Sequence, residues 1–220
     1  MKKIGVDDAG RGPVLGPMVL AGIIIDDENE EVKLKEMGAK DSKLLTRKQR
    51  AVLVKKIRGD YKYHVEIAEP KEIDEFPNLN NLEAVKCGLI INNLMKDETE
   101  KVKVVVDCPS VNTKAWSEYL MDTIVKRDLV DLHCEHKADF YHPSVSAASI
   151  IAKETREERL KVLKKELGVD FGSGYPADPR TKEFLVKTFG EKKFDSLIRK
   201  SWSTYKKIAD RCDQRKLFYL

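Results

Sequence analysis

The amino-acid sequence predicts an α/β fold in which helices flank a mixed β-sheet and a helical extension follows at the C-terminal end. Two apolar runs near the N-terminus are separated by a short glycine turn, as in a hairpin. A β-branched run lies near the middle of the chain, and amphipathic helical patterns precede and follow it. At 220 residues we expect a core over 1–179 and the extension over 180–220.

The first half of the chain contains three predicted strands and two predicted helices. The strands are expected over 4–10, 13–26 and 61–70, with the turn at Gly10–Gly12 joining the first two. Thr46 and Gln49 have the spacing of a capping box at the start of the first helix. The second helix is expected to begin at Asn81 and to present one apolar face, made of Leu82, Val85, Leu89, Ile90 and Leu94.

Two further strands, each ending in an acid, are predicted in the second half. They cover 101–107 and 129–139 and end in Asp107 and Asp139. Helices are predicted over four segments: 113–127, 144–168, 178–190 and 203–214. Small Ser and Ala residues line the first turns of the second of these helices, and they would let it approach a sheet closely.

Composition limits the class of protein. Charged residues make up 35% of the chain, and the net charge of +4 permits a polyanionic partner without requiring one. The four cysteines are scattered, which is typical of reduced thiols rather than of disulfides. No stretch approaches the roughly 20 apolar residues of a membrane span. We therefore expect a cytoplasmic protein, and a monomer because no large apolar stripe is left over.

Acidic residues follow the β-rich runs at three places. They are Asp7, with Asp8 next to it, Asp107 and Asp139. If these strands share a sheet, the carboxylates would converge at one edge of it. A partly desolvated site cannot hold so many carboxylates without a cation, although a single such Asp would be an ordinary turn residue. Oxygen-only ligands indicate Mg²⁺ or Mn²⁺ rather than zinc. Two such ions about 4 Å apart are suited to phosphodiester hydrolysis.

Other motifs match less well. Gly10, Gly12 and Gly16 are spaced one residue too widely for a dinucleotide fingerprint. The H-x-E of zinc deaminases occurs at residues 133–135, but no P-C-x-x-C follows. A zinc site is disfavoured because its candidate ligands lack the spacing of a finger; they are His133, Cys134, His136 and His142.

Six motifs occur in the order found in the ribonuclease HII family, and the chain resembles its archaeal members over nearly its whole length. They are "VDDAGRGPVLGP", "DSK", "VVVDCP", "EHKAD", "VSAASIIAK" and "GSGYPADP". The resemblance implies the ribonuclease H fold and an endonuclease that hydrolyses the RNA strand of RNA–DNA hybrids. It further implies cleavage 5′ of single ribonucleotides embedded in duplex DNA, with 3′-hydroxyl and 5′-phosphate products. The reaction would require Mg²⁺ or Mn²⁺ in a two-metal site.

The resemblance also implies roles for individual residues. The metal ligands would be Asp7, Asp8, Asp107 and Asp139. The substrate contacts would be Gly10, Arg11, Gly12, Lys43 and Tyr175. In this set the glycine turn would read the 2′-hydroxyl, the group that distinguishes RNA from DNA, because glycines admit close approach of the main chain. Tyr175 would pack on the sugar beside the scissile junction, and Lys43 would contact a phosphate. Ser146 and Ser149 are interpreted as packing residues.

Asp8 departs from the family pattern, which has Glu at this place. Aspartate is one methylene shorter, and a misplacement near 1 Å in a catalytic array costs about 10²-fold in rate. We therefore expect an altered rate or metal preference. Two alternatives stay open: a catalytically weakened protein that binds RNA–DNA hybrids, and another two-metal phosphotransfer enzyme on the same fold. The Gly10–Gly12 turn argues against the second.

The segment "QRKLFYL" at 214–220 ends in apolar and aromatic residues, which need a partner or a pocket. It resembles in part the peptide with which replication and repair enzymes dock on the sliding clamp. The clamp contacts would be Gln214, Leu217, Phe218 and Tyr219. In the other interpretation the segment folds back on the protein's own core.

Overall fold

A computed structural model describes residues 1–39 and 46–217, with the backbone alone at Arg47 and over 213–217. The strands are β1 (Lys3–Ala9), β2 (Met18–Ile25), β3 (Lys62–Ala68), β4 (Val102–Asp107) and β5 (Val130–Glu135). The helices are α1 (Glu28–Glu36), α2 (Arg47–Asp60), α3 (Pro70–Glu75), α4 (Leu79–Leu94), α5 (Thr113–Asp122), α6 (Ala138–Tyr141), α7 (Pro143–Leu167), α8 (Pro179–Lys187) and α9 (Ser203–Leu217). Short 3-10 helices cover Arg127–Leu129 and Lys192–Leu197. None of the described helices is long and apolar enough to cross a membrane.

The described chain divides into two compact units. The first is built from Met1–Ala9, Val19–Ile67 and Asn78–Arg156, and it contains most of the sheet. The second is built from Gly10–Met18, Ala68–Pro77 and the chain from Glu157 onward. The domain boundary that we expect between residues 179 and 180, which separates the core from the extension, stays a prediction.

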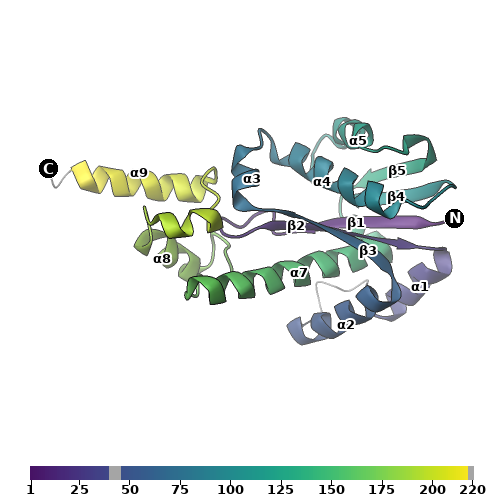
Figure 1. The fold of residues 1–220 in the computed structure, drawn as a ribbon, viewed down its shortest axis with the longest axis horizontal. Helices are drawn as coiled ribbons and strands as arrows, with labels where there is room; N and C mark the ends of the chain where they lie inside the picture. Colours follow the sequence, from purple (N-terminus) through teal and green to yellow (C-terminus); the bar gives the residue numbers. More distant parts are fainter. Residues whose placement is uncertain (40–45, 218–220) are drawn as a thin grey trace. The chain divides into compact units, whose positions relative to one another are not determined.

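The sheet has five strands in the order β3-β2-β1-β4-β5, with β1 in its centre (Figure 1). β1 pairs antiparallel with β2, with Lys3 opposite Ile25 and Ala9 opposite Val19. On its other side β1 runs parallel to β4, which in turn runs parallel to β5. The predicted mixed sheet flanked by helices is therefore confirmed.

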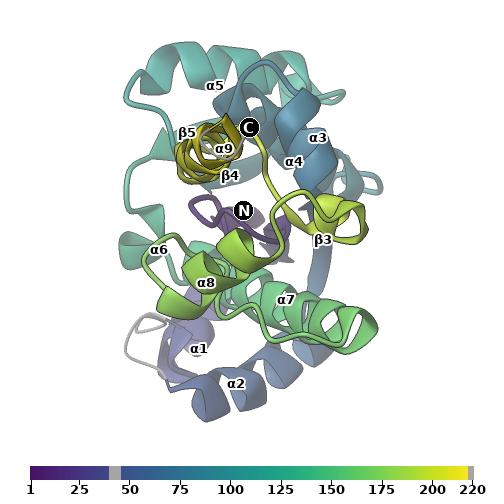
Figure 2. The ribbon, with the colours of Figure 1, turned by 90° about the vertical axis from the view of Figure 1, so that its left-hand side faces the viewer.

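Helices cover both faces of the sheet in the first unit, with α2 and the start of α7 on one side and α4 on the other (Figure 2). A Cβ on Gly5 of β1 would lie 2.4 Å from the backbone carbon of Ser144 in α7. On the α4 side, a Cβ on Gly22 would lie 2.5 Å from Ile90. The predicted close approach of the serine- and alanine-rich helix to the sheet is confirmed, and glycine is what allows it.

Several element boundaries differ from the predictions. β2 begins at Met18 rather than at residue 13, because 13–17 belong to an irregular loop of the second unit. α4 begins at Leu79, two residues before Asn81, because the Asn78 side chain caps it by accepting a hydrogen bond from the N–H of Asn80. The predicted apolar face of α4 is partly wrong. Leu89, which was expected on this face, is 46% exposed, whereas the charged residues Glu83 and Lys86 are buried.

Capping residues were the more reliable signals. At α2 the Thr46 hydroxyl accepts from the N–H of Gln49, and the Gln49 side chain accepts from the N–H of Thr46. This confirms the predicted capping box. At α8 the Asp178 side chain caps the helix as predicted, although the helix ends at Lys187, three residues before Gly190. α1 and α3 carry too few apolar residues for the sequence pattern to predict them.

The second unit has a core of its own. Phe184 packs against Phe171 and Phe194, with ring centroids 5.8 and 5.0 Å apart. Val14 and Leu15, from the loop that follows β1, are buried in the same cluster. That loop is therefore part of a packed unit rather than a free hairpin turn.

Candidate metal centre and glycine loop

Asp7 is a buried carboxylate near the end of the central strand. Its Oδ1 accepts a hydrogen bond of 2.7 Å from the N–H of Asp8. Burial raises the pKa of Asp7 well above its usual value, and the charges of Asp8 and Asp107 raise this pKa further. Ser149 of α7 lies beside Asp7 and opposes the shift. A carboxylate held in this way is under electrostatic repulsion, which a bound cation would relieve.

Three of the predicted carboxylates meet at one cavity. Asp7 and Asp8 at the end of β1 and Asp107 at the end of β4 line it together. Trp116 of α5 and Glu83 of α4 line the same cavity. Glu83, only 2% exposed, is an acid that the sequence analysis missed. Glu83 is the one acidic residue of α4, but it lies outside the apolar face predicted for this helix.

Asp139 is placed differently from the prediction. β5 ends at Glu135, and Asp139 lies in the first turn of the short helix α6. The strand ends early because Lys137 adopts a left-handed conformation with φ of 58°, which turns the chain. The segment that carries Asp139 nevertheless contacts Asp107, since the N–H of the neighbouring Ala138 donates a 2.9 Å hydrogen bond to Oδ1 of Asp107.

The donor chemistry of this cavity fits a hard divalent cation. Among the residues that the structure describes, no three acidic, histidine or cysteine side chains form a ready-made group for a metal ion. Asp7, Asp8 and Asp107 still offer carboxylate oxygens around one cavity, where burial and the charges of Asp8 and Asp107 raise the pKa of Asp7. Such oxygen ligands suit Mg²⁺ or Mn²⁺.

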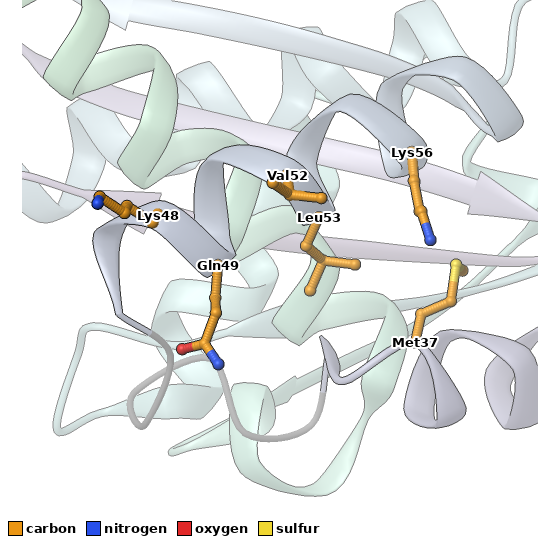
Figure 3. Close-up of a pocket in the computed structure, with 6 residues that line it drawn as sticks. All are labelled: Met37, Lys48, Gln49, Val52, Leu53 and Lys56. Atoms are coloured by element: carbon orange, nitrogen blue, oxygen red, sulfur yellow. The ribbon is translucent and has the colours of Figure 1, made fainter.

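A second hollow of the first unit, of about 430 Å³, is lined by residues of α2 and by Met37 at the end of α1 (Figure 3). Met37, Val52 and Leu53 supply its apolar lining. Among the described residues, its polar lining is formed by Lys48, Gln49 and Lys56. None of the described residues that line this hollow carries a carboxylate, so the carboxylate cavity stays the candidate metal centre.

The glycine turn belongs to the second unit. Gly10 has a φ of 86°, a left-handed conformation that favours glycine. Gly12 has no such requirement: a Cβ there would approach only Cε1 of Tyr175, at an ordinary 3.8 Å. The N–H groups of Val14 and Leu15 donate to the carbonyl of Gly174. The structure therefore brings together the two segments for which sugar contacts were predicted.

Tyr175 projects from a rigid loop. Asp178 anchors this loop by accepting hydrogen bonds from the N–H of Ser173 and the N–H of Arg180. The N–H of Ser173 is the main reason that the pKa of Asp178 falls to about 2. The Thr181 hydroxyl accepts from the N–H of Gly174 at 3.0 Å. Tyr175 itself is 44% exposed, which leaves its ring available to a ligand.

The structure does not describe the side chains of the other predicted contacts, one to the substrate and four to the clamp. Lys43, Phe218 and Tyr219 lie outside the described residues. Gln214 and Leu217 lie within α9, whose backbone alone is described at these positions.

Comparison with known proteins gives consistent results. The family model described as "Ribonuclease HII" matches residues 4–205. A Ribonuclease HII of Methanocaldococcus jannaschii is 41% identical, with 97% of each chain covered. The crystal structure of the ribonuclease H2 from Pyrococcus horikoshii superposes with a TM-score of 0.85 at 41% identity, covering 96% of this chain and 98% of that one. The ribonuclease HII in a PCNA complex from Archaeoglobus fulgidus gives a TM-score of 0.81 at 36% identity, covering 92% and 96%.

Proposed function

This chain belongs to the ribonuclease HII family, whose members cleave RNA in RNA–DNA hybrids, and we propose that it does so with two divalent cations. We also propose that it cuts 5′ of single ribonucleotides embedded in duplex DNA and leaves 3′-hydroxyl and 5′-phosphate ends. The observation that carries the proposal is the cavity shared by Asp7, Asp8 and Asp107, in which burial and like charge raise the pKa of Asp7.

The ions would be held by Asp7, Asp8, Asp107 and Asp139. When bound, Mg²⁺ or Mn²⁺ would supply an activated water and stabilise the leaving oxygen of the phosphodiester. The protein's own contribution is to fix the ligands. The N–H of Asp8 orients the Asp7 carboxylate, and the N–H of Ala138 orients that of Asp107. Gly12 and Tyr175 would contact the ribose.

The direct test uses a labelled DNA duplex with one ribonucleotide. We expect one cut, 5′ of the ribonucleotide, with Mg²⁺ or Mn²⁺ and none with EDTA, while an all-DNA duplex of the same sequence stays intact. Binding without cleavage under every metal condition would favour the hybrid-binding alternative. Cleavage of the all-DNA duplex would favour a different phosphotransfer enzyme.

Asp8→Glu tests the departure from the family pattern. Since Asp8 lines the carboxylate cavity, a side chain one methylene longer would restore the family's ligand reach. We expect the Mg²⁺-supported rate to rise, by up to about 10²-fold if a full ångström of misplacement is corrected. The measurement is the initial rate with Mg²⁺ and with Mn²⁺, and Asp122→Glu, on the exposed end of α5, is the control. A lower rate with both ions would show that the chain has adapted to aspartate.

Gly12→Ala separates sugar reading from folding. The added methyl group fits the protein, because only Tyr175 comes within 4 Å of it, but it would occupy space offered to the ribose. We expect an unchanged melting temperature and about a tenfold loss on the single-ribonucleotide duplex, the scale of one or two lost hydrogen bonds. Gly10→Ala is the contrasting variant and should lower stability, because of its φ of 86°. Full activity of Gly12→Ala would remove Gly12 from the substrate contacts.

We propose that a sliding clamp is a partner, bound through Gln214, Leu217, Phe218 and Tyr219. The support is the sequence of this segment and the PCNA complex of the similar Archaeoglobus fulgidus protein. We expect deletion of 214–220 to abolish clamp binding, measured by calorimetry, and to leave unassisted cleavage unchanged. Reduced stability with no loss of clamp binding would instead support packing on the protein's own core.

A further inference from the structure

A fully buried arginine holds the glycine turn from inside the second unit. Arg199 is 0% exposed, and its guanidinium donates three hydrogen bonds to backbone carbonyls of the loop after β1. Nη2 donates to Gly10 at 2.6 Å, Nη1 to Arg11 at 2.9 Å and Nε to Gly16 at 2.9 Å. One side chain therefore binds both ends of this loop.

Trp202 also contacts both Arg199 and the glycine turn. Its ring lies under the guanidinium, with 4.9 Å between Cζ of Arg199 and the ring centroid. Its Nε1–H donates to the carbonyl of Gly12 at 3.1 Å. The N–H of Arg199 also donates to the carbonyl of Val14. The carbonyl oxygens of Gly10, Arg11 and Gly12 are thus all bound by two side chains from one short segment.

Binding of the carbonyls fixes where the N–H groups point. In a planar trans peptide the C=O and the N–H point in opposite directions. The carbonyl of Gly10 shares a peptide group with the N–H of Arg11, and the carbonyl of Arg11 shares one with the N–H of Gly12. Since Arg199 donates to both carbonyls, both N–H groups point away from it. A turn rich in glycine has little conformational preference of its own, so this orientation needs an external constraint.

We propose that Arg199 and Trp202 are positioning residues for substrate recognition. Arg199 orients the N–H groups of Arg11 and Gly12 toward the ribonucleotide, and Trp202 supports the guanidinium and holds the next carbonyl of the turn, that of Gly12. This inference rests on the proposed sugar-reading function of the turn. Arginine suits the role because its planar guanidinium holds five donors in a fixed fork, whereas the three donors of a lysine ammonium all leave one freely rotating atom. Neither residue touches the reacting atoms in this proposal; both act through the backbone of the turn.

The experiment compares two duplexes that differ by one 2′-hydroxyl. The ratio of the dissociation constants of the all-DNA and the single-ribonucleotide duplex is measured without divalent cation, so that cleavage does not contribute. We expect the wild-type protein to favour the ribonucleotide. Arg199→Lys should lower the ratio about tenfold and Trp202→Phe about threefold, the scale of one or two lost hydrogen bonds. Arg211→Lys, at an exposed arginine of α9 in the same unit, is the matched control and should not change the ratio.

The outcomes separate the two proposals. A wild-type ratio near one would overturn sugar reading by the turn itself. A large wild-type ratio that both variants retain would overturn the positioning role and leave the sugar reading intact. A lower melting temperature of Arg199→Lys with an unchanged ratio would show that Arg199 only stabilises the fold. If Arg199→Lys does not fold, Trp202→Phe decides the question, because it keeps an aromatic ring under Arg199 and removes only the donor to Gly12.

Discussion

Asp7→Asn is expected to abolish cleavage and, at the same time, to stabilise the protein in the absence of divalent cations. The loss of a metal ligand should cost about 10³-fold or more in rate, since bound ions supply several kcal/mol of transition-state stabilisation. The gain in stability has a different cause. Burial and the charges of Asp8 and Asp107 oppose ionisation of Asp7 in the folded state, and asparagine carries no charge.

The pH dependence follows from the same shift. Because the pKa of Asp7 is higher in the folded than in the unfolded chain, the folded state binds the extra proton between the two values. The contribution of Asp7 to the free energy of unfolding is therefore largest below the unfolded pKa, and it is lost as the pH rises through the folded pKa. Above that range we expect Asp7→Asn to be more stable than wild type by about 1 kcal/mol.

The measurements are cleavage rates and melting temperatures with EDTA and with Mg²⁺ at acidic and neutral pH. Mg²⁺ at 100 times its dissociation constant should stabilise the wild type by about 2.7 kcal/mol and Asp7→Asn by much less. Asp122→Asn, on the exposed end of α5, controls for the loss of a surface charge. Wild-type cleavage by the Asp7→Asn protein would contradict its role as a ligand. A lower stability of the variant at neutral pH with EDTA would contradict the electrostatic argument.

Glu31→Gln is expected to destabilise the protein by about 3 kcal/mol, the cost of breaking a buried ion pair. Glu31 of α1 is buried, and it pairs with the buried ammonium of Lys3 in β1. It also accepts hydrogen bonds of 2.8 and 2.7 Å from the N–H and the hydroxyl of Ser144, at the start of α7. Glutamine keeps the size of the side chain but leaves Lys3 without a counter-charge.

Thermal unfolding measures this effect, and for a chain of this length about 3 kcal/mol lowers the melting temperature by roughly 10 °C. Glu36→Gln, at an exposed position of the same helix, should change it by less than one degree. If the ion pair is the cause, Lys3→Met combined with Glu31→Gln should lose less stability than Glu31→Gln alone. An unchanged melting temperature of Glu31→Gln would show that α1 does not anchor the start of α7.

The sequence predicted those features that depend on neighbours along the chain. Asp7 and Asp107 directly follow β-branched or apolar runs, so their meeting at one sheet edge could be inferred. Glu83 was missed because it lies outside the predicted apolar face of α4, whereas in the structure this helix is buried on more than that face. Asp139 was misplaced because a left-handed residue, Lys137, ended the strand early, and such conformations are rare outside glycine.

The residues that hold the glycine turn could not be predicted from the sequence for another reason. Arg199 and the carbonyl of Gly10 are 189 positions apart, and no periodicity relates residues at such a distance. Glu31 and Ser144 are likewise 113 positions apart. Motifs of this chain therefore predicted the residues that we propose for the chemistry, whereas the residues that hold them in place required the three-dimensional structure.

The central place of β1 in the sheet has a consequence for synthesis on the ribosome. β1 and β2 emerge first, but β4, the other neighbour of β1, emerges nearly 100 residues later, since Lys3 pairs with Lys103. Until then β3, which emerges in between, adds only to the far side of β2, so one edge of β1 stays unpaired. Unpaired edges recruit other strands and favour aggregation. Codon choices that slow translation between residues 26 and 101 therefore prolong the interval in which this strand is exposed to other chains.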